Sequence, residues 1–469
     1  MNDKSSGSRL YVLTATCVGA LGGLLFGYDT AVISGAERYL QKHFALDSAM
    51  TGWAASSALV GCIVGAALAG ALADAVGRKK GLLVCALLYV ISGIGTAVPQ
   101  TLDQLVWMRF VAGLGIGAAS MISPMYIAEI APAGVRGRLV AVYQLAIVVG
   151  ILLVFFVNML IQRQGDAAWN TESGWRWMFA AGIPPAVLFG LAITLVPESP
   201  RWLMKANRRD EALVVLQRVG GPDHVAAEVP EIDKSLSQTQ GTFTELFTRY
   251  RRPLVMGVLL AVFSQFSGIN TVMYYGPRIF EKIEQQGHGT FLATLVGDVV
   301  DPTFLSTVLV GVVNLIFTLL AMWLIDQVGR KLLLTVGTFV QFLALGSVAW
   351  LCGTGGAGEL KLAGILLFCA AFAAGNGVVC WVLISEIFPN RVRGRAMSLA
   401  TLCLWAACYL VSQTFPMLID EQKGIGLSLT FWMYGGFGLL NSLYVLLAVP
   451  ETRRRSLEQI EASWTVHSP

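Results

Sequence analysis

The stretch "GALADAVGRKK", residues 70–80, decides the fold because a second copy of it lies far along the chain. It returns as "MWLIDQVGRKL" at residues 322–332, so that Asp74 recurs 252 positions later as Asp326. Internal repeats of this kind are typical of transporters, which bind their substrate between the repeats near the middle of the membrane. The chain is therefore predicted to consist of two related halves.

Two further matches support the repeat. "MYIAEIAPAGVRGRL" (125–139) returns as "WVLISEIFPNRVRGRA" (381–396), and "VPESPR" (196–201) is echoed by "VPETRR" (449–454). Three charged residues of the 125–139 copy recur 257 positions later, with Glu129, Arg136 and Arg138 matching Glu386, Arg393 and Arg395.

The composition places this repeat in a lipid bilayer. Of the 469 residues, 55% are hydrophobic and 13% are charged, whereas soluble domains have about 25% charged residues. Ten stretches of at least 21 residues lack Asp, Glu, Lys and Arg, and two more, 10–36 and 104–128, hold one charge each. About 20 residues span a bilayer as a helix, and helices satisfy their own backbone groups there. We therefore predict an all-α membrane protein with twelve transmembrane helices. The charge-free stretches are 53–73, 81–102, 139–162, 177–197, 253–277, 302–325, 332–358, 362–385, 396–419 and 424–450.

The positive charges predict the orientation and the domains. With both termini on one side, that side collects 24 of the 33 Lys and Arg residues and the other side eight. This asymmetry predicts cytoplasmic termini. The net charge of +4 then reflects topology and gives no indication of nucleic-acid binding. The first apolar run is too long for a cleavable signal. The predicted domains are a first six-helix half (1–197), a cytoplasmic linker with short amphipathic helices (198–252), a second half (253–450) and a cytoplasmic tail (451–469).

No pattern in the chain predicts catalysis or a cofactor. All eight cysteines lie in apolar stretches without a CxxC pair, so they are interpreted as small hydrophobic residues. The spans contain no nucleophile–base pair and no metal-ligand cluster. We expect no enzyme activity, cofactor, metal or disulfide.

Several motifs together resemble the sugar porter family of the major facilitator superfamily. They are "LLFGYDTAVISG", "GRKK", "SPMYIAEIAP", "PESPR", "GIN" followed by "YY", "CWVLISEIFP", "RVRGRA" and "VPET". Within that family, the chain resembles most closely the bacterial D-xylose–proton symporters and the related glucose–proton symporters. The resemblance implies the major facilitator fold, with two pseudo-symmetric six-helix halves. It also implies proton-coupled symport of a monosaccharide of the D-xylose or D-glucose class by a monomer in the cell membrane.

The first span, with "GGLLFGYDTAVISG" at residues 22–35, holds a carboxylate, Asp29. An ionisable group at mid-span costs roughly 2.5–3.5 kcal/mol on insertion scales and usually has a partner. The only other charge that the sequence places within a span is Arg109, which predicts an Asp29–Arg109 pair. The resemblance implies that the pair couples transport to protons. A purely structural ion pair is the alternative.

A neutral sugar requires amides and aromatic faces, and the spans supply both. Each of these residues has helix packing as its alternative role. By resemblance, Gln144, Gln265, Asn270, Gly377 and Trp381 occupy sugar-contact positions. The full predicted set is Phe26, Gln144, Gln265, Asn270, Tyr274, Asn314, Gly377, Trp381 and Trp405.

Four positions depart from the family pattern. Ser264 replaces the first of two adjacent glutamines, and Ile151 replaces a second glutamine of the fifth span. Val378, beside an unusual Asn376, replaces a proline of the tenth span, and Leu404 stands where a polar residue commonly precedes Trp405. These departures leave the identity of the sugar open.

The repeated charges predict a gate. The resemblance implies an inter-half network of salt bridges that closes the cytoplasmic side, and anchoring of topology by the arginines is the alternative. The residues concerned are Arg78, Glu129, Arg136, Arg330, Glu386 and Arg393.

The first, fourth, seventh and tenth spans are rich in glycine, which permits bending or close helix contact. Other functions remain open. A proton-independent sugar facilitator would not require Asp29. A non-transporting sugar sensor would be favoured by long tails, whereas 19 residues follow Pro450. A channel would require a continuous polar pore.

Overall fold

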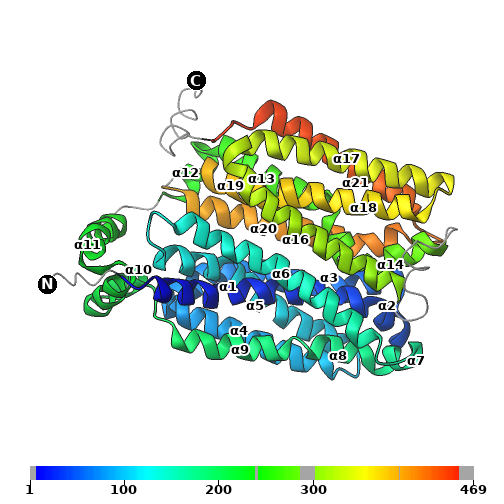
Figure 1. Cartoon of the computed structure of the whole chain (residues 1–469), viewed down its shortest axis with the longest axis horizontal. Coiled ribbons are helices and arrows are strands. Elements are labelled where there is room, and N and C mark those ends of the chain that lie inside the picture. Colours follow the sequence, from blue (N-terminus) through cyan, green and yellow to red (C-terminus); the bar gives the residue numbers. More distant parts are fainter. Residues whose placement is uncertain (1–6, 238–240, 286–300, 390, 454–469) are drawn as a thin grey trace.

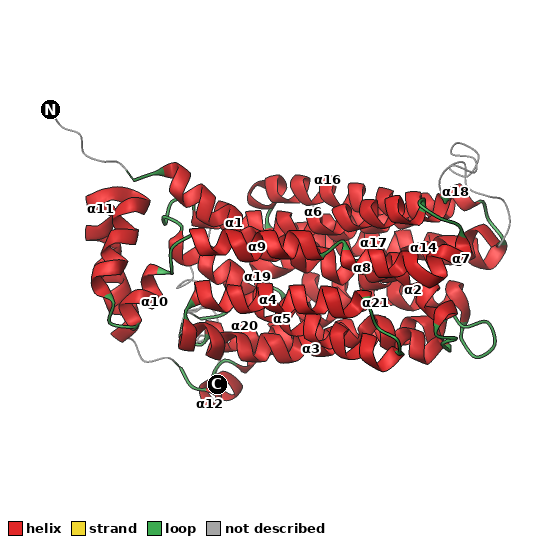
Figure 2. Cartoon of the chain, turned by 90° about the horizontal axis from the view of Figure 1, so that it is seen from below, coloured by secondary structure: helices red, strands yellow, loops and turns green. Residues whose placement is uncertain are grey.

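The computed structural model describes residues 7–237, 241–285, 301–389 and 391–453, and within these ranges it contains helices and no strands (Figure 2). Twelve segments are long and apolar enough to cross a membrane. This confirms the predicted twelve-helix fold. The segments are Arg9–His43, Ser48–Val76, Arg78–Ala97, Leu102–Ile130, Arg136–Gln162, Ala167–Leu195, Arg251–Gln285, Pro302–Val328, Arg330–Thr354, Gly358–Ile387, Arg393–Leu418 and Gly426–Ala448.

The helices of the two halves lie next to each other in one bundle (Figure 1). The first half contains α1 (Arg9–Ala31), α2 (Ile33–His43), α3 (Ser48–Val76), α4 (Arg78–Ala97), α5 (Leu102–Ile130), α6 (Arg136–Gln162), α7 (Ala167–Trp169), η1 (Asn170–Gly174), α8 (Trp175–Ala180) and α9 (Ile183–Leu195). The second contains α13 (Arg251–Phe266), α14 (Ile269–Gln285), α16 (Pro302–Val328), α17 (Arg330–Thr354), α18 (Gly358–Phe372), η3 (Ala373–Gly377), α19 (Val378–Ile387), α20 (Arg393–Leu418) and α21 (Gly426–Ala448).

The linker forms α10 (Pro200–Lys205), α11 (Arg209–Ser237) and α12 (Phe243–Thr248) at one end of the bundle, which is called the linker end (Figure 1). The opposite end, where α2 finishes and α7 lies, is called the far end. Arg136 of α6 contacts Glu228 of α11 at 3.4 Å, and Arg391 of the second half contacts Glu245 of α12 at 3.1 Å. The linker therefore contacts both halves.

The glycines of the four glycine-rich spans have two structural roles, breaking the helix and allowing close packing. The first, seventh and tenth spans are interrupted, at α1/α2, α13/α14 and α18/η3/α19. Gly268 separates α13 from α14 with φ +82°, a conformation that favours glycine. The fourth span, α5, is continuous, and a Cβ at its Gly113 would overlap the carbonyl of Ala58 in α3. Glycine in α5 thus serves close packing.

The two halves meet along matched helix pairs. α3 packs against α20, α6 against α16, and α2 against α14. Ser56 of α3 donates to Gln413 of α20 at 2.8 Å. The second and fifth spans of one half thus meet the fifth and second spans of the other, as two-fold pseudo-symmetry requires.

The expectation that Asp29 and Arg109 would be the only charges within spans is wrong. The spanning helices extend beyond the apolar stretches, so Glu37 and Arg38 lie in α2 and Arg278 in α14. Lys361, which sequence places in a loop, lies in α18 with its side chain fully buried. Tertiary contacts at helix ends explain the difference, because they bury charges that hydropathy assigns to water.

Candidate functional site

A charged cluster at the linker end of the first half is built around Arg78. Its Nη2 donates to Glu129 Oε1 at 3.0 Å, and its Nη1 lies 3.2 Å from Asp74 Oδ1. Its backbone N–H donates to Glu198 Oε1 at 2.9 Å, and Ser199 Oγ donates to Glu129. Arg78 is the first residue of α4, and the N-cap residue Gly77 makes no side-chain hydrogen bond to the helix. Glu198 therefore caps the N-terminus of α4.

The second half repeats this cluster around Arg330. Nη2 of Arg330 donates to Glu386 Oε1 at 3.2 Å, and Nη1 lies 3.2 Å from Asp326 Oδ1. The backbone N–H of Arg330 donates to Glu451 at 3.1 Å, and Thr452 Oγ1 donates to Glu386 at 2.6 Å. Sequence reasoning missed the two capping glutamates, although the echo of "VPES" and "VPET" was their signal.

Both of these clusters join helices of one half only. The other two predicted gate residues have different contacts: Arg136 contacts Glu228 of the linker, and Arg393 donates to the Phe388 carbonyl at 3.1 Å. A network between the halves at the linker end therefore stays a prediction.

Asp29 of α1 and Arg109 of α5 are neighbours in the first half, and Arg109 is only 2% exposed. Arg109 Nη1 contacts the backbone carbonyl of Asp29 at 3.4 Å, and Nη2 donates to the Ala55 carbonyl of α3 at 3.1 Å. Its guanidinium carbon lies 5.7 Å from the ring centre of Phe179. Among the described residues, no ion pair within 4.0 Å joins the Asp29 carboxylate to Arg109. The predicted pair is thus brought together, but its side chains are not directly bonded in this conformation.

The predicted amides of the seventh span form one hydrogen-bonded group. Gln265, at the end of α13, donates to Ser264 Oγ at 3.0 Å, and its Oε1 accepts from Asn270 at the start of α14. The turn at Gly268 brings the two amides together across the break in the span. Ser264, which replaces a family glutamine, therefore serves as an acceptor for Gln265.

Three of the four predicted aromatic residues, Phe26, Tyr274 and Trp405, lie where the halves face each other. Phe26 of α1 and Trp405 of α20 have ring centres 5.5 Å apart, and Tyr274 OH lies 4.0 Å from Cys408 Sγ, one turn beyond Trp405. The Trp405 Nε1–H is buried and has no hydrogen-bond partner among the residues that the structure describes. A buried unpaired donor is costly, so a ligand oxygen at this position would be favourable.

The remaining predicted sugar contacts lie on four elements. Gln144 lies on α6 and Asn314 on α16, two helices that pack against each other across the halves. Gly377 ends η3, and Trp381 lies one turn later in α19, where it is 37% exposed. No direct contact joins these four in the described part of the chain, so their convergence on one sugar stays a prediction.

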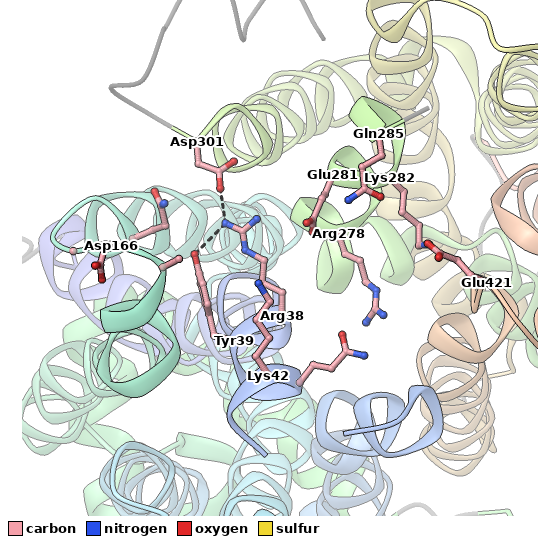
Figure 3. A pocket seen from close by; sticks show the side chains of 14 residues that line it. Arg38, Tyr39, Lys42, Asp166, Arg278, Glu281, Lys282, Gln285, Asp301 and Glu421 are labelled. Atoms are coloured by element: carbon pink, nitrogen blue, oxygen red, sulfur yellow. Dashed lines mark hydrogen bonds and ion pairs between the residues drawn. The ribbon is translucent and has the colours of Figure 1, made fainter. Parts of the chain in front are cut away.

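Ion pairs that sequence reasoning missed hold the halves together at the far end. Glu37 of α2 pairs with Arg278 of α14. Arg38 pairs with Asp301, the residue before α16 (Figure 3). The Glu37 side chain is 3% exposed and that of Arg278 is 15% exposed. Ser48 at the start of α3 also donates to Asp420, which follows α20. We call the two ion pairs and this hydrogen bond the far-end latch.

The latch borders a cavity of about 480 Å³ lined by residues of both halves (Figure 3). Its charged lining is Arg38, Lys42, Asp166, Arg278, Glu281, Lys282, Asp301 and Glu421. Cations and carboxylates are equally numerous in this set. The cavity therefore fits a water-filled vestibule better than a site for one charged ligand.

The latch carboxylates outside the spans are held in the ionised form. Burial acts to raise the pKa of Asp301, but the charge and hydrogen bonds of Arg38 prevail and leave that pKa below its usual value. Hydrogen bonds from Ser48 Oγ and from the backbone N–H groups of Gln422 and Lys423 lower the pKa of Asp420 to about 2. Both groups therefore stay charged at ordinary pH.

Comparison with known proteins identifies the family. The model of the family described as "Sugar (and other) transporter" matches residues 15–464. The chain belongs to this family. It is therefore a multi-pass membrane transporter and not an enzyme, and the resemblance found in the sequence is confirmed.

Two similar proteins, one of them in two solved structures, refine the comparison. The chain is 42% identical to an arabinose-proton symporter of Bacillus subtilis (strain 168), with 98% of this chain and 96% of that protein covered. The inward open conformation of the xylose transporter XylE from E. coli matches with a TM-score of 0.84 and 39% identity, over 97% of this chain and all of the other. The proton:xylose symporter XylE bound to 6-bromo-6-deoxy-D-glucose matches with a TM-score of 0.79 and 39% identity, over 97% and 99%. The fold is thus more similar to the inward open structure.

Proposed function

We propose that this protein is a proton-coupled symporter of a neutral monosaccharide of the D-xylose or D-glucose class. The observation that carries the proposal is the position of Arg109 and Asp29, a buried cation beside a carboxylate, next to α1 residues that meet the second half. Proton symporters of arabinose and of xylose are among its relatives. A facilitator would not require this charged group.

Sugar recognition follows from the groups that line the meeting place of the halves. Gln265 and Asn270 can exchange their mutual hydrogen bond for bonds to sugar hydroxyls. Trp405 Nε1–H can donate to another hydroxyl, and the exposed ring of Trp381 can cover an apolar face of the sugar. Among the described residues assigned to the site, Asp29 and Arg109 are the only charged ones, so a neutral polyol is favoured.

Proton coupling follows from the contacts of Arg109. With Asp29 protonated, the guanidinium bonds the backbone carbonyls of Asp29 and Ala55, as in this conformation. An ionised Asp29 would attract the guanidinium and weaken those bonds, which link α5 to α1 and α3. Protonation thus changes which inter-helix contacts are favourable. A ligand or proton can shift a conformational equilibrium only through such a difference.

Alternating access follows from the asymmetry between the ends. The far-end latch joins the halves, whereas the Arg78 and Arg330 clusters stay within their own halves. We interpret the conformation as inward-facing, with the linker end in the cytoplasm, because 24 of 33 Lys and Arg residues belong to that side. Outward opening would break the latch and let Glu129, Arg136, Glu386 and Arg393 bridge the halves.

The proposal also covers the membrane, the topology and the oligomeric state. We place the protein in the cell membrane with both termini cytoplasmic, functioning as a monomer, because each helix of the site belongs to one chain. Sugar and a proton are its small-molecule partners, and the lipid bilayer is its environment.

The test is uptake of radiolabelled arabinose, xylose and glucose into proteoliposomes. A proton gradient, acid outside, should drive accumulation above the external concentration for at least one sugar, and a protonophore should abolish it. Uptake that stops at equal concentrations under both conditions would identify a facilitator. Binding without any uptake would identify a sensor.

A further inference from the structure

The tenth span contains a π-helical turn directly before Val378, the position where the family has a proline. The helix α18 ends at Phe372, η3 runs from Ala373 to Gly377, and α19 begins at Val378. A π-helical turn leaves backbone carbonyls without their ordinary i+4 partners, and such turns are frequent at functional sites. A proline would enforce an interruption here covalently, so this chain must stabilise the turn in another way.

Three buried amides surround this turn. Asn376 Nδ2 lies 3.4 Å from Gln341 Oε1 of α17, and Asn441 Nδ2 of α21 lies 3.4 Å from Asn376 Oδ1. Gln341 Nε2 in turn contacts the Ala371 carbonyl, in the turn before η3, at 3.5 Å. The three side chains are between 0% and 3% exposed. An amide chain thus runs from α21 through η3 to α17 and back to the carbonyl end of α18.

The backbone of η3 also lies directly against α17 on the same face. A Cβ at Gly337, one turn before Gln341, would come within 3.0 Å of both Gly375 Cα and the Ala371 carbonyl oxygen. Close approach of this kind lets amide side chains bond across the helices. Apolar residues of similar size would fill the same space without the cost of burying amides, so packing alone does not require this set.

Trp381 lies on the helix that follows the π-helical turn. Trp381 lies four residues after the end of η3, and its side chain is 37% exposed. An indole with so much open surface is fixed less by neighbours than by the backbone that carries it. The orientation of η3 therefore determines where this ring stands relative to a bound sugar.

We infer that Asn376, with Gln341 and Asn441, is a positioning residue that stands in for the family proline and holds Trp381 in its sugar-binding place. The inference rests on the proposed function, because Trp381 must contact the sugar. The amides touch neither sugar nor Asp29 and act through the helix that bears the indole.

The test uses the KM for sugar uptake in proteoliposomes. Asn376→Leu should raise KM about fivefold to thirtyfold, the factor that one or two kcal/mol gives, with a smaller change in maximal rate. In a Trp381→Ala background, the same substitution should change KM less than twofold, because the positioned ring is already absent. An equal rise of KM in both backgrounds would overturn the inference.

Two further variants separate positioning from damage to the fold. The combination of Asn376→Leu, Gln341→Leu and Asn441→Leu removes all three amides, so none of them is left buried without its partner. Its thermal stability should stay near that of the parent while KM stays high. Ser442→Ala is the matched control. It deletes a partly buried 3.0 Å bond from α21 to the Thr335 carbonyl of α17, which is not part of the amide chain, and should leave KM unchanged. Normal KM in the triple variant would refute the positioning role.

Hydrogen exchange provides a readout independent of sugar. Backbone amides of residues 373–380 should exchange faster in Asn376→Leu than in the parent and in Ser442→Ala. Unchanged exchange in Asn376→Leu would overturn the inference. If Trp381→Ala alone leaves KM unchanged, the proposed sugar contact has failed, whereas the exchange result still decides whether the amides hold the turn.

Discussion

Breaking the far-end latch should shift this transporter toward the outward-facing state. Glu37→Gln removes one partner of a pair whose side chains are 3% and 15% exposed, and it leaves Arg278 buried without its counter-charge. The pair joins α2 to α14, and thus the two halves, so its loss destabilises only the conformation in which the far end is closed.

The burial of the Glu37–Arg278 pair determines how much free energy its loss costs. Removing one member of a buried ion pair costs about 3–5 kcal/mol, and the neighbouring vestibule favours the lower limit because water can reach Arg278. At 1.36 kcal/mol per factor of ten, about 3 kcal/mol changes the ratio of inward-facing to outward-facing molecules about 150-fold.

Distances between spin labels measure this ratio directly. Labels at the exposed far-end positions Gln164 and Lys423, one on each half, should give a larger long-distance population in Glu37→Gln than in the parent. The swap Glu37→Arg with Arg278→Glu should restore the parental distribution. Arg208→Gln, which breaks an exposed pair with Glu211 inside the linker, is the control and should have no effect. A shift below fivefold in Glu37→Gln, or a swap that restores nothing, would refute the latch.

Three other predictions concern the sugar site, the gate and pH. Gln265→Ala and Trp381→Ala should each weaken sugar binding by about 1–3 kcal/mol in calorimetry, and unchanged affinity in both would move the site elsewhere. Glu129→Gln should favour the inward-facing state by roughly 5–30-fold and slow transport more than it lowers affinity, as labelling of a thiol in the linker-end vestibule would report; equal labelling with normal transport would leave Glu129 as an anchor. Because the pKa of Asp420 is lowered to about 2, its contribution to the closed far end is complete above its ordinary pKa of 3.8 and is lost only as pH falls toward 2. Asp420→Asn should therefore leave the shape of the transport pH profile between pH 5 and 8 unchanged, and a displaced profile would contradict this assignment.

The repeat made the architecture predictable from sequence. Asp74 and Asp326 identified two copies of one motif, and the structure builds the same arginine–carboxylate cluster around each copy. Twelve apolar stretches gave twelve spans because a bilayer fixes the length of a helix that crosses it.

The far-end latch was not predictable, for a physical reason. Glu37 and Arg278 are 241 positions apart, and each follows an apolar stretch at a point where hydropathy predicts water. Their pairing depends on how the halves pack in one conformation, which no local pattern encodes. Lys361 illustrates the same effect, since sequence assigns it to a loop whereas it lies in α18 and is fully buried.

The site itself was predictable in its parts but not in its contacts. Sequence placed Asp29 near Arg109, yet the guanidinium bonds backbone carbonyls in this conformation and not the carboxylate. It also gave Gln265 and Asn270 as separate candidates, whereas the turn at Gly268 joins them. Such contacts depend on side-chain rotamers and on conformational state, neither of which residue type determines.

The central claim, that a proton on Asp29 drives sugar transport, is tested most directly by Asp29→Asn in proteoliposomes. Asparagine keeps the size of the side chain and resembles the protonated carboxyl, so the inward-facing contacts of Arg109 should persist. The variant should still exchange sugar in counterflow, since exchange requires no net proton movement, but a proton gradient should drive no accumulation. Accumulation by Asp29→Asn at the parental level would contradict the account and place proton coupling at another residue.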